Sequence, residues 1–230
     1  MRTFDVIVIG GGPAGSVTAG CCARAGLSVA LFEHCTFPRH KVCGDTINPG
    51  CWPVFEHLQV ADSIRALPQH IITAAQFTTP DGASLDVPIH AHAIQRSQFD
   101  AVLLHHARQC GVTVFEGEAA HILTASKEVQ TSTGIYRARR ALVGADGRNS
   151  IVAAKLGMKR QSARMSHIAF QAHFRAPPAE SAFHRVKRRE QVLRGDIRSG
   201  GTFKKCDTIH IIGLARWRNR RAFVPVGHSA

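Results

Sequence analysis

The sequence lacks any long apolar run. None of its apolar stretches reaches the roughly 20 residues that a membrane-spanning helix needs. Its first residues lead directly into a short β-branched run, without the apolar segment of a signal peptide. Hydrophobic residues make up 44% and charged residues 20% of the 230 positions, which is typical of globular domains in water. We therefore expect a cytoplasmic protein with no transmembrane segment.

The sequence also lacks the cysteine and histidine patterns of metal sites. Its seven cysteines form no CxxC pair, and their odd number excludes a complete disulfide framework. The 14 histidines are scattered, and the close pairs His90/His92 and His105/His106 have no cysteine or carboxylate at ligand spacing. The sequence therefore predicts buried thiols in a reducing compartment and no metal ion.

Positive charge is in excess, with a formal net charge of +13. Residues 1–175 hold 17 basic and 12 acidic residues, a net charge of +5, whereas residues 176–230 hold 12 and 4, a net charge of +8. A nucleic-acid or anionic-surface binder is one hypothesis, and its binding would be sensitive to salt. It depends on the C-terminal segment alone, so we expect no nucleic-acid partner.

The stretch with the clearest chemical pattern is residues 5–15, a short run of β-branched residues that ends in a glycine cluster. A helix of small residues and a second strand, residues 28–33, follow it. Gly10 allows a sharp turn off the strand, Gly12 removes the side chain that would block a pyrophosphate, and Gly15 lets the helix lie close to the sheet. This pattern predicts a dinucleotide-binding unit.

Three further residues agree with this prediction. Pro13 and Ala14 fit the first helical turn, whose free N–H groups attract an anion. Glu33 ends the second strand at the spacing where an acidic residue accepts hydrogen bonds from a ribose diol, each worth about 1.5–3 kcal/mol when sheltered. The same carboxylate disfavours a phosphate on that ribose, so NADP is not expected at this site.

Prolines, glycines and polar residues predict a loop over residues 35–50. Its Arg39 follows the strand that ends at Glu33, where loops line the crevice of an open α/β sheet, so we expect it to face the cofactor phosphates. Lys41 is expected to be an ordinary surface residue. Apolar spacing predicts a helix or helix pair over residues 51–67.

A second glycine cluster follows a predicted strand at residues 138–144. Asp146 at the carboxyl end of this strand can accept hydrogen bonds from a sugar or ribityl hydroxyl, while Gly144 and Gly147 permit close backbone approach. An ordinary Asp-Gly turn is the alternative. The remaining predictions are a β-hairpin around Asp81-Gly82, a helix over 97–111, strands at 112–115, 119–134, 167–175 and 208–214, and a helix over 151–157.

With both glycine clusters in view, residues 1 to about 175 resemble the FAD-dependent oxidoreductases of the aromatic-hydroxylase superfamily. That group includes the group A flavoprotein monooxygenases, the flavin halogenases and the geranylgeranyl reductases, and the choice among reductase, monooxygenase and halogenase stays open. The stretch from Phe37 to Gly44 is most similar to the geranylgeranyl reductase-like branch. The resemblance implies an α/β fold with a Rossmann-like parallel sheet and an incomplete antiparallel substrate sheet. It divides the chain into an FAD-binding domain (1–70 and 96–160), a partial substrate domain (71–95 and 161–178) and an atypical basic tail (179–230).

The resemblance also implies residue roles. Arg39 would approach the FAD phosphates, Cys43 and Gly44 would lie near the isoalloxazine, and Cys43 becomes the candidate catalytic residue. Arg96 matches a family arginine that contacts the cofactor, and Ala120 falls where the family packs backbone against adenine. The full set of expected cofactor-binding residues is Gly10, Gly12, Pro13, Ala14, Gly15, Glu33, Arg39, Cys43, Gly44, Arg96, Ala120, Asp146 and Gly147.

The expected activity is flavin-mediated reduction of a carbon–carbon double bond, or NAD(P)H- and O2-dependent hydroxylation, of a small organic or isoprenoid-like substrate. Peripheral membrane contact and the oligomeric state stay open. The third family motif is missing, since Gly195-Asp196 does not continue as that motif does. A C-terminally truncated chain, read in a changed frame from about residue 176, is the expected explanation. The alternative function is therefore a non-catalytic nucleotide-binding remnant.

Overall fold

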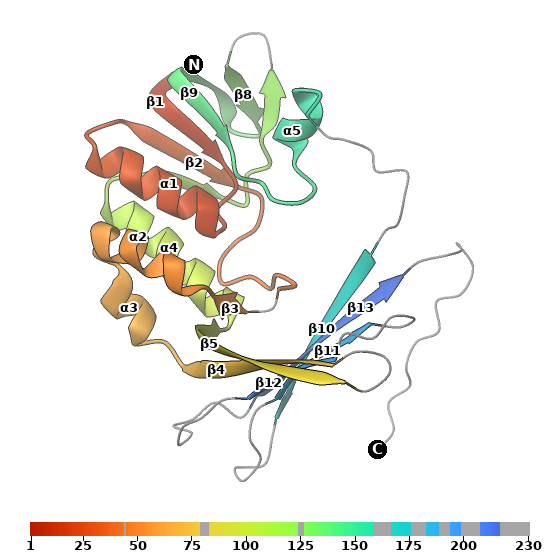
Figure 1. Ribbon diagram of the computed structural model, residues 1–230. Helices are drawn as coiled ribbons and strands as arrows, with labels where there is room; N and C mark the ends of the chain where they lie inside the picture. Colours follow the sequence, from red (N-terminus) through yellow and green to blue (C-terminus); the bar gives the residue numbers. More distant parts are fainter. Residues whose placement is uncertain are drawn as a thin grey trace. The chain divides into compact units, whose positions relative to one another are not determined.

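The computed structural model describes residues 1–43, 45–78, 83–123 and 127–158, together with four further strands within 167–216 (Figure 1). The chain divides into two compact units. The first comprises residues 1–41, 45–70 and 91–161, and the second comprises residues 42–44, 71–90 and 162–230. The predicted hairpin turn at Asp81-Gly82 lies outside the described residues.

A six-stranded sheet forms the centre of the first unit, in the order β6-β2-β1-β9-β8-β7. β1 pairs in parallel with β2 on one side and with β9 on the other, and β2 pairs in parallel with β6. β8 pairs antiparallel with both β7 and β9. The strands are β1 (Arg2–Ile9), β2 (Val29–Glu33), β6 (Thr113–Glu116), β7 (His121–Leu123), β8 (Glu128–Thr131) and β9 (Gly134–Gly144).

Residues 6–9 of β1 and 29–32 of β2 are buried on both faces, which explains the unbroken apolar sequence of each segment. On one face Val6, Val8 and Leu31 pack with Ala19 of α1 (Pro13–Arg24) and Leu104 of α4 (Arg96–Gln109). The two helices contact each other along this face (Figure 1). The small residues of α1 suit this close packing.

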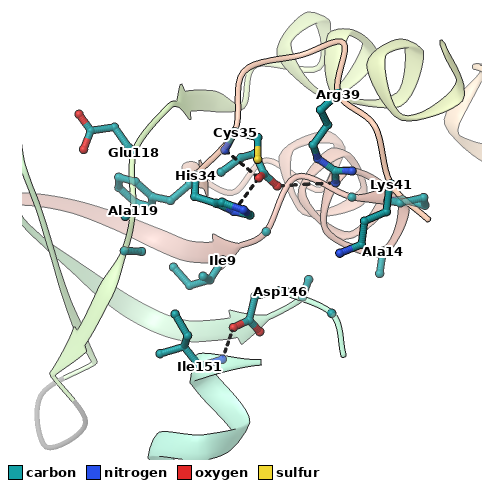
Figure 2. A pocket seen from close by; sticks show the side chains of 18 of the residues that line it. Ile9, Ala14, His34, Cys35, Arg39, Lys41, Glu118, Ala119, Asp146 and Ile151 are labelled. Atoms are coloured by element: carbon teal, nitrogen blue, oxygen red, sulfur yellow. Dashed lines mark hydrogen bonds and ion pairs between the residues drawn. The ribbon is translucent and has the colours of Figure 1, made fainter. Parts of the chain in front are cut away.

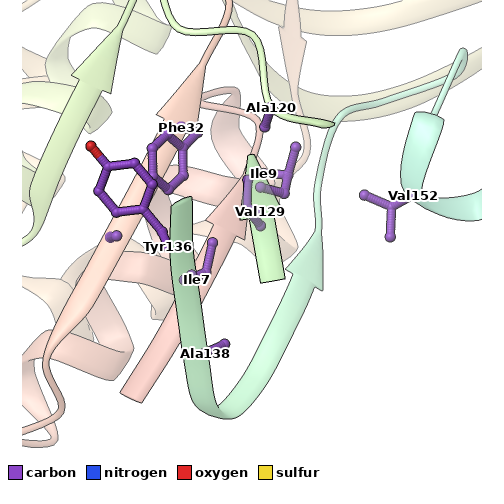
Figure 3. Packing of buried hydrophobic residues seen from close by; sticks show 9 residues of the cluster. Ile7, Ile9, Phe32, Ala120, Val129, Tyr136, Ala138 and Val152 are labelled. Atoms are coloured by element: carbon purple, nitrogen blue, oxygen red, sulfur yellow. The ribbon is translucent and has the colours of Figure 1, made fainter. Parts of the chain in front are cut away.

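The opposite face of the sheet carries an aromatic cluster. The rings of Phe32 and Phe115 stack with centroids 4.7 Å apart, and Tyr136 meets Phe32 edge-on at 4.9 Å. Ile7 and Val129 complete its buried centre (Figure 3). This layer joins β1, β2, β6, β8 and β9, so it fixes the strand ends that surround the site.

The predicted helix pair at residues 51–67 is present as α2 (Trp52–Leu58) and α3 (Ala61–Arg65), preceded by the short 3-10 turn η1 (Pro49–Cys51). Phe55, Leu58 and Ile64 pack with residues of α4. Within the described part of the chain, none of the helices has the length and apolar character to cross a membrane.

A seven-stranded sheet has the order β10-β13-β11-β12-β4-β5-β3. Its described pairings are antiparallel except for that of β11 with β13. The fold class expected from the sequence, an α/β unit with a separate antiparallel sheet, is confirmed. The strands are β3 (Thr46–Ile47), β4 (Gln69–Thr78), β5 (Ser84–Ile94), β10 (His167–Arg175), β11 (Phe183–Arg188), β12 (Arg194–Arg198) and β13 (Thr208–Arg216).

Two of these strands, β11 and β12, were not expected from the sequence. Their residues, Phe-His-Arg-Val-Lys-Arg and Arg-Gly-Asp-Ile-Arg, show no alternation of apolar and polar residues. β12 pairs with β4 and β11 pairs with β13. Pairing with neighbouring strands, rather than local pattern, therefore accounts for both. The short strand β3 also lies within the segment that the sequence predicted to be a loop.

Candidate functional site

A cavity of about 400 Å³ lies at the carboxyl ends of the parallel strands of the first unit. The turn after β1, the end of β2 and the turn after β9 contribute to its wall (Figure 2). This is where an open α/β sheet places its ligands. The lining residues are Ile9, Gly10, Gly12, Pro13, Ala14, Phe32, Glu33, His34, Cys35, Arg39, His40, Lys41, Arg96, Glu118, Ala119, Ala120, His121, Ala145, Asp146, Gly147 and Ile151.

The turn after β1 is tightly packed at its two ends. Gly10 has φ +105°, and a Cβ there would overlap the carbonyl oxygen of Ala145. A Cβ at Gly15 would overlap the carbonyl oxygen of Gly10. Gly15 is therefore buried behind the cavity and shapes it without lining it. The close approach of Gly10 to Ala145 also joins the two glycine clusters that the sequence showed separately.

The middle of the same turn is open. Gly12 is the N-cap of α1 in extended backbone, and a Cβ there would have Arg39 Nη2, 3.5 Å away, as its nearest neighbour. Within the described residues, no side chain caps this helix and its first turn holds no acidic residue. The N–H groups of a first helical turn have no intrahelical acceptor. The start of α1 can therefore receive an anion.

Glu33 is almost fully buried, and its carboxylate is oriented from three directions. Oε2 accepts a hydrogen bond from the backbone N–H of Gly11 at 2.7 Å, and Oε1 accepts one from the N–H of Cys35 at 3.0 Å. His34 Nδ1 lies 2.9 Å from Oε1. Because a carboxylate has about four acceptor positions, it retains capacity for a ligand hydroxyl.

Two arginines meet at one buried carboxylate beside the cavity. Arg96 Nε and Nη2 lie 2.6 Å and 2.8 Å from the two oxygens of Asp100, which is fully buried. Arg39 Nη1 lies 3.2 Å from Asp100 Oδ2, and Arg39 Nη2 lies 3.8 Å from Glu33 Oε2. Among the described residues, the buried Nε of Arg39 has no hydrogen-bond partner, and its buried Nη1 has only the ion pair with Asp100. Nη2 is the group of this guanidinium that lies beside Gly12.

The second glycine cluster is engaged with its own helix, α5 (Ile151–Lys155). Asp146 Oδ2 accepts hydrogen bonds from the N–H groups of Ile151 at 2.5 Å and Val152 at 3.3 Å, and Oδ1 accepts one from the Ser150 hydroxyl at 2.6 Å. Ser150 Oγ in turn accepts from the N–H of Ala153. The carboxylate therefore holds the start of α5 at the cavity wall.

The structure brings ten of the thirteen predicted residues to this cavity. Ala120 lines it and is also buried against the aromatic cluster. Of the other three, Gly15 lies behind the wall, Cys43 is half-buried and does not line the cavity, and Gly44 lies outside the described residues. Lys41, expected to be a plain surface residue, is exposed and lines the cavity.

Sequence reasoning missed several residues of this site. The sequence analysis did not single out Asp100, although the i,i+4 spacing of Arg96 and Asp100 was a usable signal. Backbone donors such as Gly11 N–H leave no trace in a sequence. Glu33, His34 and Cys35 also place one ligand atom each within 4.8 Å of one another, a group that the search for metal-ligand spacing overlooked. These are the same three residues whose hydrogen bonds and ion pair orient the Glu33 carboxylate.

Comparison with known proteins gives a consistent result. The family model described as FAD binding domain matches residues 3–220. A flavin-dependent halogenase (armH1) of Armillaria mellea is 32% identical over 179 residues, which cover 66% of this chain and 32% of that protein. The geranylgeranyl diphosphate reductase of Rhodobacter capsulatus is 32% identical over 162 residues, covering 65% of this chain and 39% of that protein. The chain thus spans well under half the length of these relatives.

Solved structures agree in fold. The myxobacterial chondrochloren halogenase CndH superposes with a TM-score of 0.65 and 21% identity, over 86% of this chain and 53% of that one. The halogenase PltM, solved in complex with phloroglucinol and FAD, has a TM-score of 0.64 and 19% identity, over 77% of this chain and 41% of that one. Both likenesses concern the fold.

Proposed function

The chain belongs to the FAD-binding domain family, and from this premise we propose that it is the cofactor-binding part of an FAD-dependent oxidoreductase acting on a small organic substrate. The observation that carries the proposal is the open start of α1. Gly12 faces the cavity without a capping side chain, and Arg39 presents its Nη2 group beside it. An anionic group such as a pyrophosphate satisfies both.

The residues of the cavity fit FAD in three further respects. A buried carboxylate, Glu33, is held at the end of β2 with acceptor capacity for a ribose diol. Ala120 offers a small, buried wall for adenine. The cavity continues to Asp146 and Gly147 at the start of α5, where a ribityl hydroxyl would find an acceptor. The donor and acceptor set therefore matches the cofactor.

We assign the roles accordingly. Glu33 binds and orients the adenosine ribose, while Gly12 and Arg39 bind the pyrophosphate. Arg96 and Asp146 line the route towards the flavin, and Cys43 and Gly44 are proposed to lie near the isoalloxazine, with Cys43 as candidate catalytic thiol. FAD, when bound, supplies hydride transfer or oxygen activation. The protein contributes binding, orientation and the exclusion of water.

For the reaction we propose reduction of a carbon–carbon double bond or NAD(P)H- and O2-dependent hydroxylation. The likeness to the geranylgeranyl diphosphate reductase supports the reductase branch, and the likeness to the halogenase armH1, at the same 32% identity, supports an oxidative reaction. NAD(P)H as electron donor and a cytoplasmic location are part of the proposal. In its most specific form, the proposal assigns the chain to the geranylgeranyl reductase-like branch.

The test is the visible absorption spectrum of the purified chain after FAD is added and the protein is desalted. We expect a retained flavin spectrum in the wild type and in Gly20→Ala, a control in the middle of α1 whose added Cβ would lie 3.5 Å from Leu58 Cδ2. We expect its loss in Gly12→Ala, whose Cβ enters the cavity. A colourless wild type would contradict the proposal.

A second measurement separates binding from catalysis. If the flavin is retained, anaerobic addition of NADH or NADPH should bleach its absorbance, which would identify the donor. A chain that retains FAD and is bleached by neither, but is reduced by dithionite, would instead support the alternative of a nucleotide-binding protein without this activity. Comparing uncoupled peroxide formation in air with turnover of isoprenoid and aromatic substrates would then distinguish the branches.

A further inference from the structure

Asp100 is the one fully buried carboxylate among the described residues that two arginines share. It lies one turn into α4 with 0% exposure, and Arg96, the first residue of the same helix, binds both of its oxygens. Arg39 reaches it from the loop after β2. A buried charge is costly unless it is paired, so this carboxylate depends on both guanidinium groups.

The same geometry places Arg39 between two carboxylates. Nη1 is 3.2 Å from Asp100 Oδ2, and Nη2 is 3.8 Å from Glu33 Oε2. The guanidinium also stacks over Phe37, with 4.7 Å from Cζ to the ring centroid. Glu33 is the residue expected to bind the ribose. If Arg39 formed a full ion pair with Glu33, the carboxylate would no longer accept from the ribose, and the guanidinium would no longer donate to the phosphates.

We propose that Asp100 is a positioning residue that holds Arg39 away from Glu33. The ion pair with Asp100 keeps the Arg39 guanidinium beside the start of α1, where Nη2 lies near Gly12. Glu33 then remains available to the ribose. This inference rests on the proposed function, since it concerns binding of the same nucleotide. Arg96 completes the arrangement by neutralising Asp100, so that the pair of arginines retains positive charge towards the cavity.

Removal of Asp100 has two effects of opposite sign. The loss of a negative charge raises the positive potential at the cavity and favours phosphate binding. The release of Arg39 allows it to pair with Glu33 and disfavours both ribose and phosphate binding. The proposal requires the second effect to exceed the first, because the released guanidinium would form a directed charge-assisted hydrogen bond with Glu33 in a sheltered site.

The test compares two ligands, ADP and adenosine, by titration calorimetry on wild type and Asp100→Asn. Asn is close to Asp in size, which limits the disturbance of the buried site. We expect ADP to bind about tenfold more weakly to the variant. Adenosine, which lacks phosphates, should lose at most about threefold, through the ribose alone. A general loss of structure would instead weaken both ligands equally, and that result, or tighter ADP binding, would overturn the proposal.

A double-mutant cycle identifies the residue through which Asp100 acts. In an Arg39→Met background, Asp100→Asn should change ADP affinity by less than about twofold, because there is no longer a guanidinium to hold. The full loss in that background would overturn the inference. If Asp100→Asn does not fold, Asp100→Glu, which keeps the charge but shifts the carboxylate, is judged by the same ADP and adenosine criteria. A wild type that binds neither ligand contradicts the proposed function itself.

Discussion

Two helix starts in this molecule follow the same plan of strand, glycine turn and helix, yet they differ in what they offer. The start of α1 has glycine at its N-cap and, among the described residues, no capping side chain. The start of α5 is capped twice, by Ser150 and by Asp146. Both border one cavity. A shared local pattern therefore does not imply a shared role.

The difference shows how a chain separates binding from support. At α1 the free N–H groups and the dipole of a 12-residue helix are left for a ligand. At α5, a helix of five residues, the carboxylate of Asp146 takes the place that an anion would occupy. The N–H groups at the start of α1 are therefore left to bind a ligand, whereas those at the start of α5 bind Asp146 and Ser150 and stabilise the helix.

The largest expected effect comes from filling the closed end of the first turn. Gly15→Ala would drive its Cβ into the carbonyl oxygen of Gly10, so we expect a loss of more than about 4 kcal/mol in the free energy of unfolding. The matched change in the second region, Gly144→Ala, meets the side chain of Val152 at 2.7 Å and should cost about 1–3 kcal/mol. Urea denaturation measures both, and equal losses would contradict the comparison.

The second prediction converts the open helix start into a capped one. Gly12→Asp supplies α1 with the carboxylate that α5 already has, next to Arg39 Nη2. We expect FAD affinity to fall by about 100-fold or more, because the new carboxylate occupies the anion position and repels phosphate. The free energy of unfolding should change by less than about 0.5 kcal/mol. Fluorescence titration with FAD and thermal unfolding measure the two quantities.

The third prediction opens the capped start instead. Ser150→Ala removes one cap of α5 without touching the cavity lining, so it should cost about 1 kcal/mol of stability and leave FAD affinity unchanged. Asp146→Ala should cost about 1–2 kcal/mol. If Asp146 also binds the cofactor, only this second variant loses FAD affinity. Unchanged stability in both variants would argue against the capping role.

The smallest expected effect is a change in the pH dependence of stability, and it comes from Asp5, on β1 away from the cavity. The Ser28 hydroxyl and backbone N–H, with the charge of Arg139, lower the pKa of Asp5 from its usual 3.8 to about 2. Because the folded-state pKa is depressed, the stabilisation is present above pH 3.8 and is lost as the pH falls towards 2. Asp5→Asn should flatten the stability profile in that window and leave FAD binding at pH 7 unchanged. An identical acid limb in both proteins would refute this.

The order β1-α1-β2 could be predicted because its signals are local. Residues 6–9 are continuously apolar, as a strand buried on both faces requires, and the glycines follow at fixed offsets. Gly111, with φ +95°, likewise ends α4 as its sequence indicates. In each case the deciding interaction lies within a few residues of the signal.

What could not be predicted depends on contacts between distant segments. The role of Asp100 arises because a loop arginine reaches a helix that begins at residue 96. The orientation of Glu33 comes in part from a backbone N–H at Gly11, which any residue except proline would supply. The engagement of Asp146 with α5 was within reach, since Ser150 has the signature of an N-cap. The dinucleotide-binding pattern instead led to the prediction that Asp146 binds a ligand hydroxyl.

The central position of β1 has a consequence for how the protein is made. One edge of β1 is paired early, since Val8 lies opposite Leu31, but the other edge waits for β9, where Val8 lies opposite Val143. At translation rates of roughly 5–20 residues per second, that apolar edge stays without its partner for on the order of ten seconds. The nascent N-terminal half is thus the stage most exposed to aggregation, and the cavity closes only after the second glycine cluster has left the ribosome.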